Sequence, residues 1–426
     1  MTAEENDLPL APPRGMRDFY PEDMAVRNAV FDAWKAAAAA HGFVPYDSCV
    51  VEQLSLLKRK AGEEIVDQIY AFTDKSGREL ALRPEMTPTL ARMVAARQSA
   101  LTMPLKWYTI AQCFRYERMS KGRKREHYQW NLDIIGEPSV AAETDVLTTA
   151  TAALSALGLG ATDYRIHVNS RAVLSELLAA SGIPADKHPT CLLALDKRGK
   201  MPDAEIEQML RDAGIAPEQT PRVFDILKLD SLESVRAHLG SPTPVALDRL
   251  CALFDMGAAY GIGDILKFDI GVVRGLTYYT GIVFEAFDVN RELRAIFGGG
   301  RYDNLLGDLG GSPATAVGLG FGDVVVAELL ASKGRTGAIS QSRLDLAVGF
   351  MTEDQRLAAV RFGVAMRKKG LSVDIALAPE KPKHFFSRTG RGAFRQAAYL
   401  GPDDISKGTV RIKDLATRSE TEAPIA

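Results

Sequence analysis

Hydrophobic and polar residues alternate along two stretches that lie close together in the chain, at 105–116 and 126–135. Alternation with a period of two is typical of β-strands, and the polar, strongly basic segment 117–125 connects these two. The pattern therefore predicts a long antiparallel hairpin with a flexible tip. Apolar runs predict further strands at 43–51, 265–273 and 281–289.

Helical patterns flank these strands. Pro21 opens an Ala-rich run that Gly42 closes, and Pro at the first turn with Gly at the end is typical of a helix. Residues from about 170 to 239 carry short helical patterns that Pro and Gly interrupt, so we interpret them as an insertion. Further helices are predicted at 87–97, 141–157, 245–260 and 323–332.

A second, smaller unit is predicted near the C-terminus. A polar linker at 333–342 precedes a strand, a helix and a strand at 344–348, 353–369 and 371–376, the start of a βαβ module. We therefore expect an α+β main domain, with an antiparallel sheet, flanking helices and a mostly helical insertion, followed by a small α/β domain. The predicted parts are a flexible tail at 1–13, the main domain at 14–332, the linker, and the last domain at 343–426.

Composition places the chain among soluble globular proteins with more than one core. It has 426 residues, of which 46% are hydrophobic and 25% are charged. No apolar run approaches the roughly 18 residues that span a bilayer, and the acidic, Pro-rich N-terminus does not resemble a signal peptide. Cysteines and histidines are scattered without metal-ligand spacing, so we expect no protein-built metal site and a cytoplasmic, reducing compartment. The four cysteines are Cys49, Cys113, Cys191 and Cys251.

Charge is distributed unevenly. From Arg343 onward there are 15 basic and 10 acidic residues, which gives +5, so the rest carries −7 of the net charge of −2. A basic terminal module is compatible with contact to a polyanion, and an ordinary solvated surface explains the charge equally well.

The tip of the predicted hairpin concentrates positive charge. Arg115 closes the first strand, and Glu117 is the only acid among the basic residues that follow it. Like charges in a short loop repel one another, so the cluster costs stability unless an anion binds there. Guanidinium groups pair with phosphate through two parallel hydrogen bonds, which makes phosphate the expected ligand, although a solvated loop is the alternative. The basic residues are Arg118, Lys121, Arg123, Lys124 and Arg125.

Polar residues also line one face of the second strand. Gln129, Asn131 and Asp133 are spaced two apart and therefore share a face, between the apolar Trp130 and Leu132. This row predicts either the polar floor of a pocket or an exposed sheet face.

Two further motifs offer polar side chains, and one of them also contains a glycine whose backbone no side chain covers. Glu85 and Thr87 stand at the start of the helix predicted at 87–97, where capping is the simpler explanation. Arg274 is followed by Gly275 and by the pair Tyr278 and Tyr279, which supply a cation, open backbone and two phenols.

Glycines alternate ahead of the helix predicted at 323–332. Gly318, Gly320 and Gly322 leave one strand face flat, so a planar ring could lie against it. This spacing differs from the Gly-x-Gly-x-x-Gly fingerprint of dinucleotide-binding proteins.

Together and in this order, these segments resemble the class II aminoacyl-tRNA synthetases and, within them, the histidyl-tRNA synthetase family. Residues 114–118, continuing to Gln129, are similar to motif 2 of class II. Arg274-Gly275-Leu276 with Tyr278-Tyr279, and residues 299–303, are similar to the two histidine-specific signatures. The similarity runs from about Pro13 to Arg418 and includes 14–18 and 399–415.

The resemblance implies a set of roles. The activity would be histidine activation with ATP and Mg²⁺, followed by transfer to tRNA-His, in a homodimer. The catalytic residues would be Arg115 and Arg274, which grip the α-phosphate. Histidine would be bound by Glu85, Thr87, Gln129, Asp133, Tyr278 and Tyr279. ATP would further be bound by Arg118, Arg123, Gly320 and Gly322, and tRNA by Arg14, Arg118 and Lys121.

The chain also departs from the family pattern. Val325 stands where motif 3 usually has an arginine that reaches the γ-phosphate, so the motif 2 loop, through Arg118 or Arg123, would have to hold that phosphate. Cys49 replaces a common motif 1 proline, and residues 381–395 match poorly. These departures support an alternative, a catalytically impaired paralogue that acts as a histidine sensor or as the regulatory subunit of a partner enzyme.

Overall fold

The computed structural model describes residues 10–59, 66–198, 201–276, 278–336, 344–391 and 394–425. The chain divides into two compact units, and apart from residues 21–25, which are grouped with the second, the boundary between them along the sequence follows Thr336. This boundary lies within the segment predicted as a linker. Residues 337–342 of that segment, and residues 1–9 of the predicted tail, lie outside the described residues.

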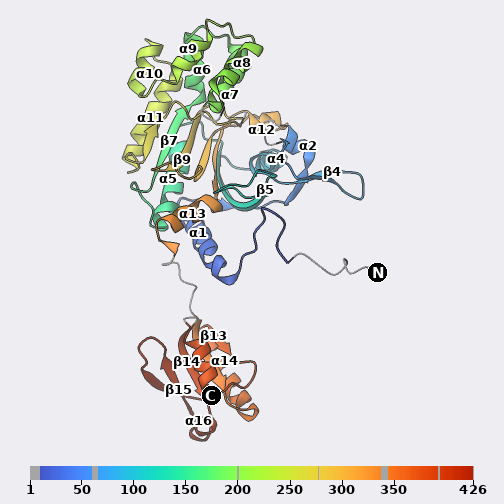
Figure 1. Cartoon of the computed structure of the whole chain (residues 1–426), viewed down its shortest axis with the longest axis vertical. Coiled ribbons are helices and arrows are strands. Elements are labelled where there is room, and N and C mark those ends of the chain that lie inside the picture. The colour runs from blue at the N-terminus through green and yellow to red at the C-terminus, as the bar shows by residue number, and fades with distance from the viewer. Residues whose placement is uncertain are drawn as a thin grey trace. The chain divides into compact units, whose positions relative to one another are not determined.

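An eight-stranded sheet forms the centre of the first unit (Figure 1). Its strands, in spatial order, are β1 (Val44–Pro45), β5 (Leu105–Phe114), β6 (Glu126–Ile135), β11 (Ala316–Gly322), β10 (Phe297–Arg301), β9 (Ile282–Asp288), β7 (Tyr164–Ser170) and β8 (Leu266–Phe268).

Pairing is antiparallel from β5 through to β7, as predicted, but it is parallel at both edges. The sequence did not predict these parallel edge strands. Parallel neighbours need a long crossover connection, and both edges have one. Residues 46–104 lie between β1 and β5 in the chain, and residues 171–265, which include the helical insertion, lie between β7 and β8.

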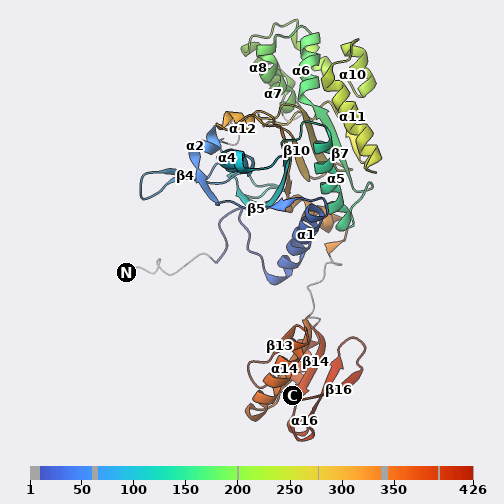
Figure 2. The same ribbon diagram turned by 180° about the vertical axis from the view of Figure 1, so that it is seen from behind.

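Helices cover the sheet (Figure 2). The buried Trp34 of α1 stacks on Trp130 of β6 at a ring separation of 5.7 Å and meets the edge of Phe321 at 5.2 Å. A fully buried tryptophan of this kind stabilises a domain by roughly 3–5 kcal/mol relative to alanine. The longer helices of the first unit outside the insertion are α1 (Pro21–Ala40), α4 (Thr87–Arg97), α5 (Ala141–Ala156), α11 (Val245–Ala259) and α13 (Asp323–Ser332), and a short one, α12 (Leu305–Asp308), packs against α4.

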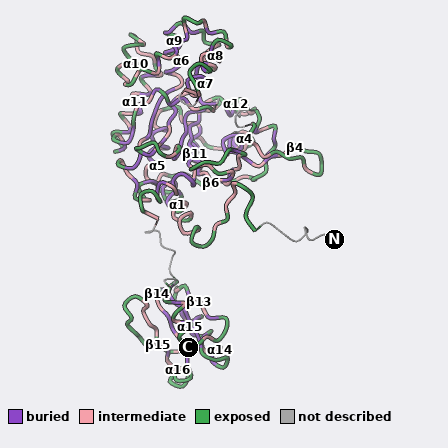
Figure 3. The backbone as a smooth tube through the Cα atoms, viewed as in Figure 1, coloured by how far each residue is buried: buried purple, intermediate pink, exposed green. Residues whose placement is uncertain are grey.

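The predicted insertion is helical and lies at one end of the unit in Figure 1. It consists of α6 (Arg171–Ala180), α7 (His188–Lys197), α8 (Asp203–Asp212), α9 (Thr220–Ile226) and α10 (Leu232–Leu239). A small three-stranded sheet with the short helix α2 (Leu54–Lys58) lies beside α4, and its strands are β2 (Val51–Gln53), β4 (Glu79–Leu82) and β3 (Ala71–Thr73). Burial concentrates in the large sheet, where β6 and β11 are drawn in purple in Figure 3.

The second unit is a five-stranded α/β domain. The order β13-β12-β14-β15-β16 begins with parallel strands around a helix, as the βαβ pattern predicts. Its core includes Phe350 and Phe362, both fully buried. The elements are β12 (Leu344–Phe350), α14 (Arg356–Lys368), β13 (Val373–Ile375), α15 (Pro382–Thr389), β14 (Phe394–Leu400), α16 (Pro402–Lys407), β15 (Thr409–Asp414) and β16 (Glu420–Pro424).

Two predicted strands are much shorter than expected. The stretch 43–51 contains only β1 and the first residue of β2, and the stretch 265–273 contains only β8. In the second case the buried side chain of Asn169 on β7 donates hydrogen bonds to the carbonyls of Ile270 and Val272, at 2.8 and 3.1 Å. These bonds hold the chain outside the sheet, where it leads to Arg274.

Candidate amino-acid and phosphate site

A cavity of about 660 Å³, counted to its open mouth, lies where β6, β11 and β10 meet the loop before β9. Of the predicted site residues, those that line it are Glu85, Thr87, Arg115, Gln129, Arg274, Tyr278, Tyr279, Gly320 and Gly322. A second cavity adjoins it and shares Arg115, Gln129, Arg274, Ala295 and Gly322 with the first.

Arg115 follows directly on β5. Its Nε donates to the carbonyl of Pro84 at 3.0 Å, and its backbone N–H donates to the carbonyl of Arg125 at 2.9 Å. The first bond aims the guanidinium at the segment that carries Glu85, and the second closes the hairpin. Arg115 therefore enters the cavity from a rigid strand end.

Arg274 reaches the same cavity from a loop with an unusual backbone. Its φ is +63°, in the left-handed region that few residues other than glycine adopt. Its Nη1 donates to Glu285 at 2.5 Å, and the guanidinium lies close to the backbone of Gly298, where a Cβ would come within 2.9 Å of the Arg274 Cζ. Although burial opposes the charge, Tyr279 and Glu285 raise the pKa of Arg274 above its usual value.

Residues from β7 and α6 fix this loop. Asn169 binds two of its carbonyls, as described above, and Arg171 donates from Nη1 to the carbonyl of Leu276 at 2.7 Å. The sequence pattern contained no signal for either residue, because each acts on backbone about 100 positions away. They fix the backbone on both sides of Arg274, whose side chain lines the same cavity as Arg115.

Glu85 and Thr87 do not cap α4. The cap position is Met86, whose side chain makes no capping hydrogen bond. The Glu85 carboxylate instead accepts a hydrogen bond from the Tyr278 hydroxyl at 3.1 Å, across the wall of the cavity. Burial raises the pKa of Glu85, while Arg115 and Tyr278 act in the opposite direction. The capping explanation for these two residues is therefore wrong.

The polar row on β6 forms part of the cavity floor. Gln129 and Asn131 line it, and their side chains are joined by a hydrogen bond of 3.1 Å from Gln129 Nε2 to Asn131 Oδ1. The register sets Gly322, Gly320 and Gly318 of β11 opposite Gln129, Asn131 and Asp133.

The glycine face is not as open as predicted. A Cβ on Gly318 would come within 2.8 Å of Asp133 Cγ, and one on Gly320 within 2.8 Å of Gln129 Cδ. The polar side chains therefore lie over these two glycines, and only Gly322 has open space in front of it. The glycines make room for the polar row, so the flat surface predicted for a planar ring is limited to Gly322.

Asp133 was predicted to line the pocket, but it lies behind the cavity wall. It is 1% exposed and is absent from the cavity lining, whereas Tyr302, which does line it, donates from its hydroxyl to Asp133 Oδ1 at 2.5 Å. The other oxygen, Oδ2, has no hydrogen-bond partner among the described residues. Burial raises the pKa of Asp133 to about 7, and the Tyr302 hydrogen bond acts in the opposite direction. Sequence reasoning missed Tyr302, although it lies in the 299–303 signature.

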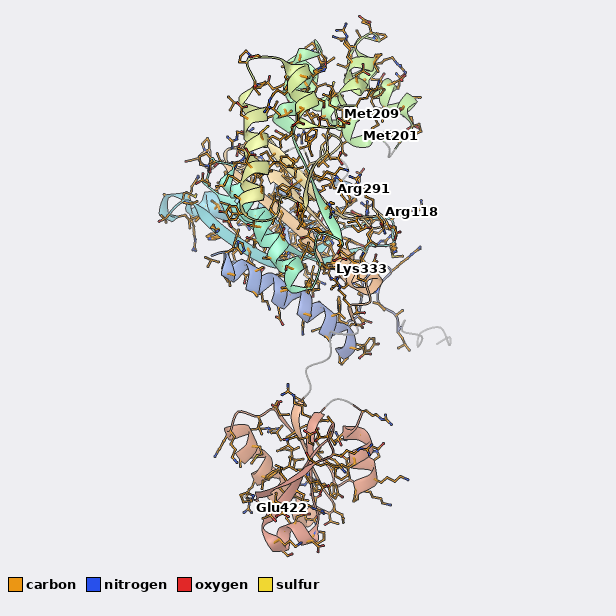
Figure 4. All side chains as sticks on the ribbon, turned by 90° about the vertical axis from the view of Figure 1, so that its left-hand side faces the viewer. Arg118, Met201, Met209, Arg291, Lys333 and Glu422 are labelled. Atoms are coloured by element: carbon orange, nitrogen blue, oxygen red, sulfur yellow. The ribbon has the colours of Figure 1, made fainter. Side chains whose placement is uncertain are left out.

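The basic hairpin tip divides into two groups. Arg123 lines the second cavity and forms an ion pair with Glu117. Arg118 and Lys121 are exposed and line neither cavity, and Figure 4 shows Arg118 at the edge of the unit. The structure therefore does not bring Arg118 to the site where it was predicted to hold a phosphate of ATP, because its side chain projects from an exposed turn.

The N-terminal segment lies against this tip. The carbonyl of Gly15 accepts a hydrogen bond from the Arg125 N–H at 2.9 Å, and Arg17 forms ion pairs with Glu126 at 2.6 Å and Asp323 at 3.0 Å. These contacts hold the exposed Arg14 beside the hairpin tip.

The fold is that of a class II aminoacyl-tRNA synthetase, since it matches the crystal structure of histidyl-tRNA synthetase from Nostoc sp. PCC 7120 with a TM-score of 0.79. That match has 22% sequence identity and covers 98% of this chain and 97% of the other.

A model of the histidyl-tRNA synthetase family matches residues 15–322. The chloroplastic/mitochondrial histidine–tRNA ligase of Arabidopsis thaliana is 40% identical, over 98% of this chain and 86% of that protein. The histidine–tRNA ligase of Opitutus terrae is 40% identical, over 96% of this chain and 95% of that protein. The chain belongs to the histidyl-tRNA synthetase family.

The described residues hold neither a metal-binding cluster nor a membrane-spanning helix. No three of their His, Cys, Asp or Glu side chains gather closely enough to hold a metal ion. Among the same residues, no helix has both the length and the apolar character that crossing a bilayer requires.

Proposed function

We propose that this chain activates histidine with ATP and transfers it to the 3′ end of tRNA-His. The observation that carries the proposal is that Arg115 and Arg274, from segments far apart in the sequence, line one cavity together with Glu85, Thr87 and Gln129. Two guanidinium groups there suit a phosphoryl centre, and the acidic and amide groups beside them suit an amino acid.

The first step needs no strong base, because the carboxylate of histidine is already ionised. A carboxylate oxygen bonds to the α-phosphorus of ATP, the bond from that phosphorus to the bridging oxygen breaks, and pyrophosphate leaves with the electron pair. Negative charge spreads over the phosphoryl oxygens in the transition state, so preorganised cations there lower the barrier. Arg115 and Arg274 are held by hydrogen bonds before the substrate arrives, and therefore supply that charge without reorganisation.

Histidine is held at both ends in this proposal. Glu85, Thr87 and Gln129 bind its α-amino group. Its imidazole lies toward Tyr278, Tyr279 and the Tyr302–Asp133 pair.

Selectivity follows from the buried carboxyl. Asp133 accepts the hydrogen bond of the Tyr302 hydroxyl, so the phenol oxygen at the cavity wall is left to accept a hydrogen bond from the imidazole N–H, and a side chain without such a group would leave it unpaired. Leaving buried polar groups unpaired is a strong basis for rejecting such analogues.

Mg²⁺ is proposed to arrive with ATP, on the phosphates, and when bound it neutralises part of their charge. The residues fit a metal ion that is held by the phosphates, because two carboxylates beside these cations already form ion pairs. Glu285 pairs with Arg274, and Glu117 pairs with Arg123. Arg123 and Gly322, which line the second cavity, would contact the nucleotide.

In the second step, a ribose hydroxyl of the terminal tRNA nucleotide attacks the carbonyl carbon of the adenylate, loses its proton, and AMP leaves. Arg14, Arg118 and Lys121 are exposed at and beside the hairpin tip, which suits them to the phosphates of the acceptor end. We further propose that the C-terminal unit binds the anticodon region and that the chain works as a homodimer.

The alternative, a histidine sensor or regulatory subunit, is not favoured. A sensor needs the amino-acid cavity but not the adjoining cavity, whose lining includes Arg123, Lys124 and Arg274. The two curated relatives named above are histidine–tRNA ligases, and their matches to this chain cover 86% and 95% of their own lengths.

The test is pyrophosphate exchange with each of the twenty amino acids, followed by aminoacylation of total tRNA. We expect exchange with histidine alone and charging of tRNA-His. Histidine binding without ATP–pyrophosphate exchange would refute the proposal and support the sensor.

A further inference from the structure

The second cavity raises the question of how this chain holds the outer phosphates of ATP. Val325, at the start of α13, lines this cavity and is 6% exposed. It stands where an arginine is usual in this family, so the sequence offers no cation from α13 at that point. Helix α13 therefore contributes an apolar wall, and any replacing charge must come from another element.

Arg294 supplies a side chain at the same place from a different part of the fold. It lies in the turn between β9 and β10, a segment that the sequence motifs did not include. A Cβ on Gly122, at the hairpin tip, would come within 3.7 Å of Arg294 Cγ and 3.4 Å of Val325 Cγ2. The stem of Arg294 and the Val325 side chain therefore both lie next to the backbone of Gly122.

The hairpin tip is fixed in this position. The N–H of Gly122 donates to Glu328 Oε1 of α13 at 2.9 Å, one turn beyond Val325. The left-handed φ of +74° at Gly122 permits the turn that makes this contact. The tip, α13 and the β9–β10 turn thus form three walls of the second cavity.

The charge of Arg294 is also available. Among the described residues, no hydrogen bond or ion pair to the Arg294 guanidinium is present, and its side chain is exposed. Of the nearby acids, Glu117 pairs with Arg123, and Glu328 accepts from Gly122 through Oε1, while its Oε2 has no partner among the described residues. By contrast Arg291, in the same turn, is held by Asp269 at 2.7 Å and lines neither cavity.

We infer that Arg294 binds the β- and γ-phosphates of ATP, and the departing pyrophosphate, in place of the arginine that is absent at Val325. The inference rests on the proposed function, because it names one more phosphate ligand of the same reaction. The cations around the second cavity then number five, namely Arg115, Arg123, Lys124, Arg274 and Arg294. A polyanion of the size of a triphosphate needs such a set, and guanidinium forks suit it best.

The test is Arg294→Ala in the full-length chain, with Arg291→Ala as the matched control from the same turn. Histidine-dependent pyrophosphate exchange is measured over a range of ATP and of histidine concentrations. We expect Arg294→Ala to raise KM for ATP by roughly tenfold to a hundredfold, as loss of a hydrogen bond to a charged group does, with KM for histidine unchanged. Arg291→Ala should match the wild type in both constants.

A double variant tests the replacement itself. Arg294→Ala combined with Val325→Arg returns a guanidinium to the second cavity from α13, and we expect it to recover much of the lost affinity for ATP. An unchanged KM for ATP in Arg294→Ala, or an equal increase in Arg291→Ala, would overturn the inference. A wild-type chain without histidine-dependent exchange would instead contradict the proposed function, so the two failures are distinguishable.

Discussion

Asp133 gives the most quantitative prediction, because its burial couples stability to pH. We expect Asp133→Asn to remove a pH-dependent loss of stability that the wild type suffers. The carboxamide oxygen of the variant can still accept the hydrogen bond that Tyr302 donates at 2.5 Å in the wild type, so the packing of the site should be preserved. The change therefore isolates the ionisation of one buried group.

The magnitude follows from the pKa. Burial raises the pKa of Asp133 from 3.8 to about 7. Between these values the unfolded chain releases the proton and the folded chain retains it, so stability falls as pH rises from about 4 to about 7 and is constant above that. A shift of about three pKa units corresponds to a loss on the order of 4 kcal/mol, which the amide cannot show because it does not ionise.

The assay is urea unfolding followed by tryptophan fluorescence at several pH values. All three tryptophans, Trp34, Trp107 and Trp130, lie in the first unit, so the signal reports that unit alone. The free energy of unfolding of Asp133→Asn minus that of the wild type should increase by about 4 kcal/mol between pH 4 and pH 8. Any constant cost of the buried amide cancels from this difference.

A pH-independent difference between the two proteins would refute the reasoning. It would mean that Asp133 ionises in the folded state as readily as in the unfolded chain. In pyrophosphate exchange, we also expect the variant to raise KM for histidine while KM for ATP is retained. Equal loss of both affinities would count against a histidine pocket at Asp133.

Three further variants test the site and its support. Arg274→Ala should lower histidine-dependent exchange by roughly 100-fold or more with the urea midpoint retained, since a charge donor to the transition state is lost, and near-normal exchange would contradict its role. Glu143→Gln breaks the buried pair with Arg301, whose side chains are 0% and 4% exposed, and should cost about 3–5 kcal/mol in urea unfolding. Gly318→Ala places a methyl group against Asp133 and should raise KM for histidine roughly tenfold or more, with KM for ATP as the internal control.

Local pattern was sufficient for much of the fold. The predicted helices at 87–97 and 323–332 coincide with α4 and α13, and the predicted hairpin strands coincide with β5 and β6 to within two residues. Such elements depend on periodicity and end signals that a short stretch of sequence contains. The motif residues Glu85, Arg115 and Arg274 were also identifiable, because each stands at the end of an element or in a Gly-flanked loop.

Only the tertiary structure decided how these residues act together. Asn169 holds the loop of Arg274. Asp133 and Gln129 fill the space over Gly318 and Gly320 of β11, and Arg294 lies beside Val325. Each of these depends on contacts between segments far apart in the chain. Sheet register and loop closure determine such contacts, and neither produces a periodic pattern in the sequence. The pKa of Asp133 is of the same kind, because the desolvation that raises it comes from every element packed around it.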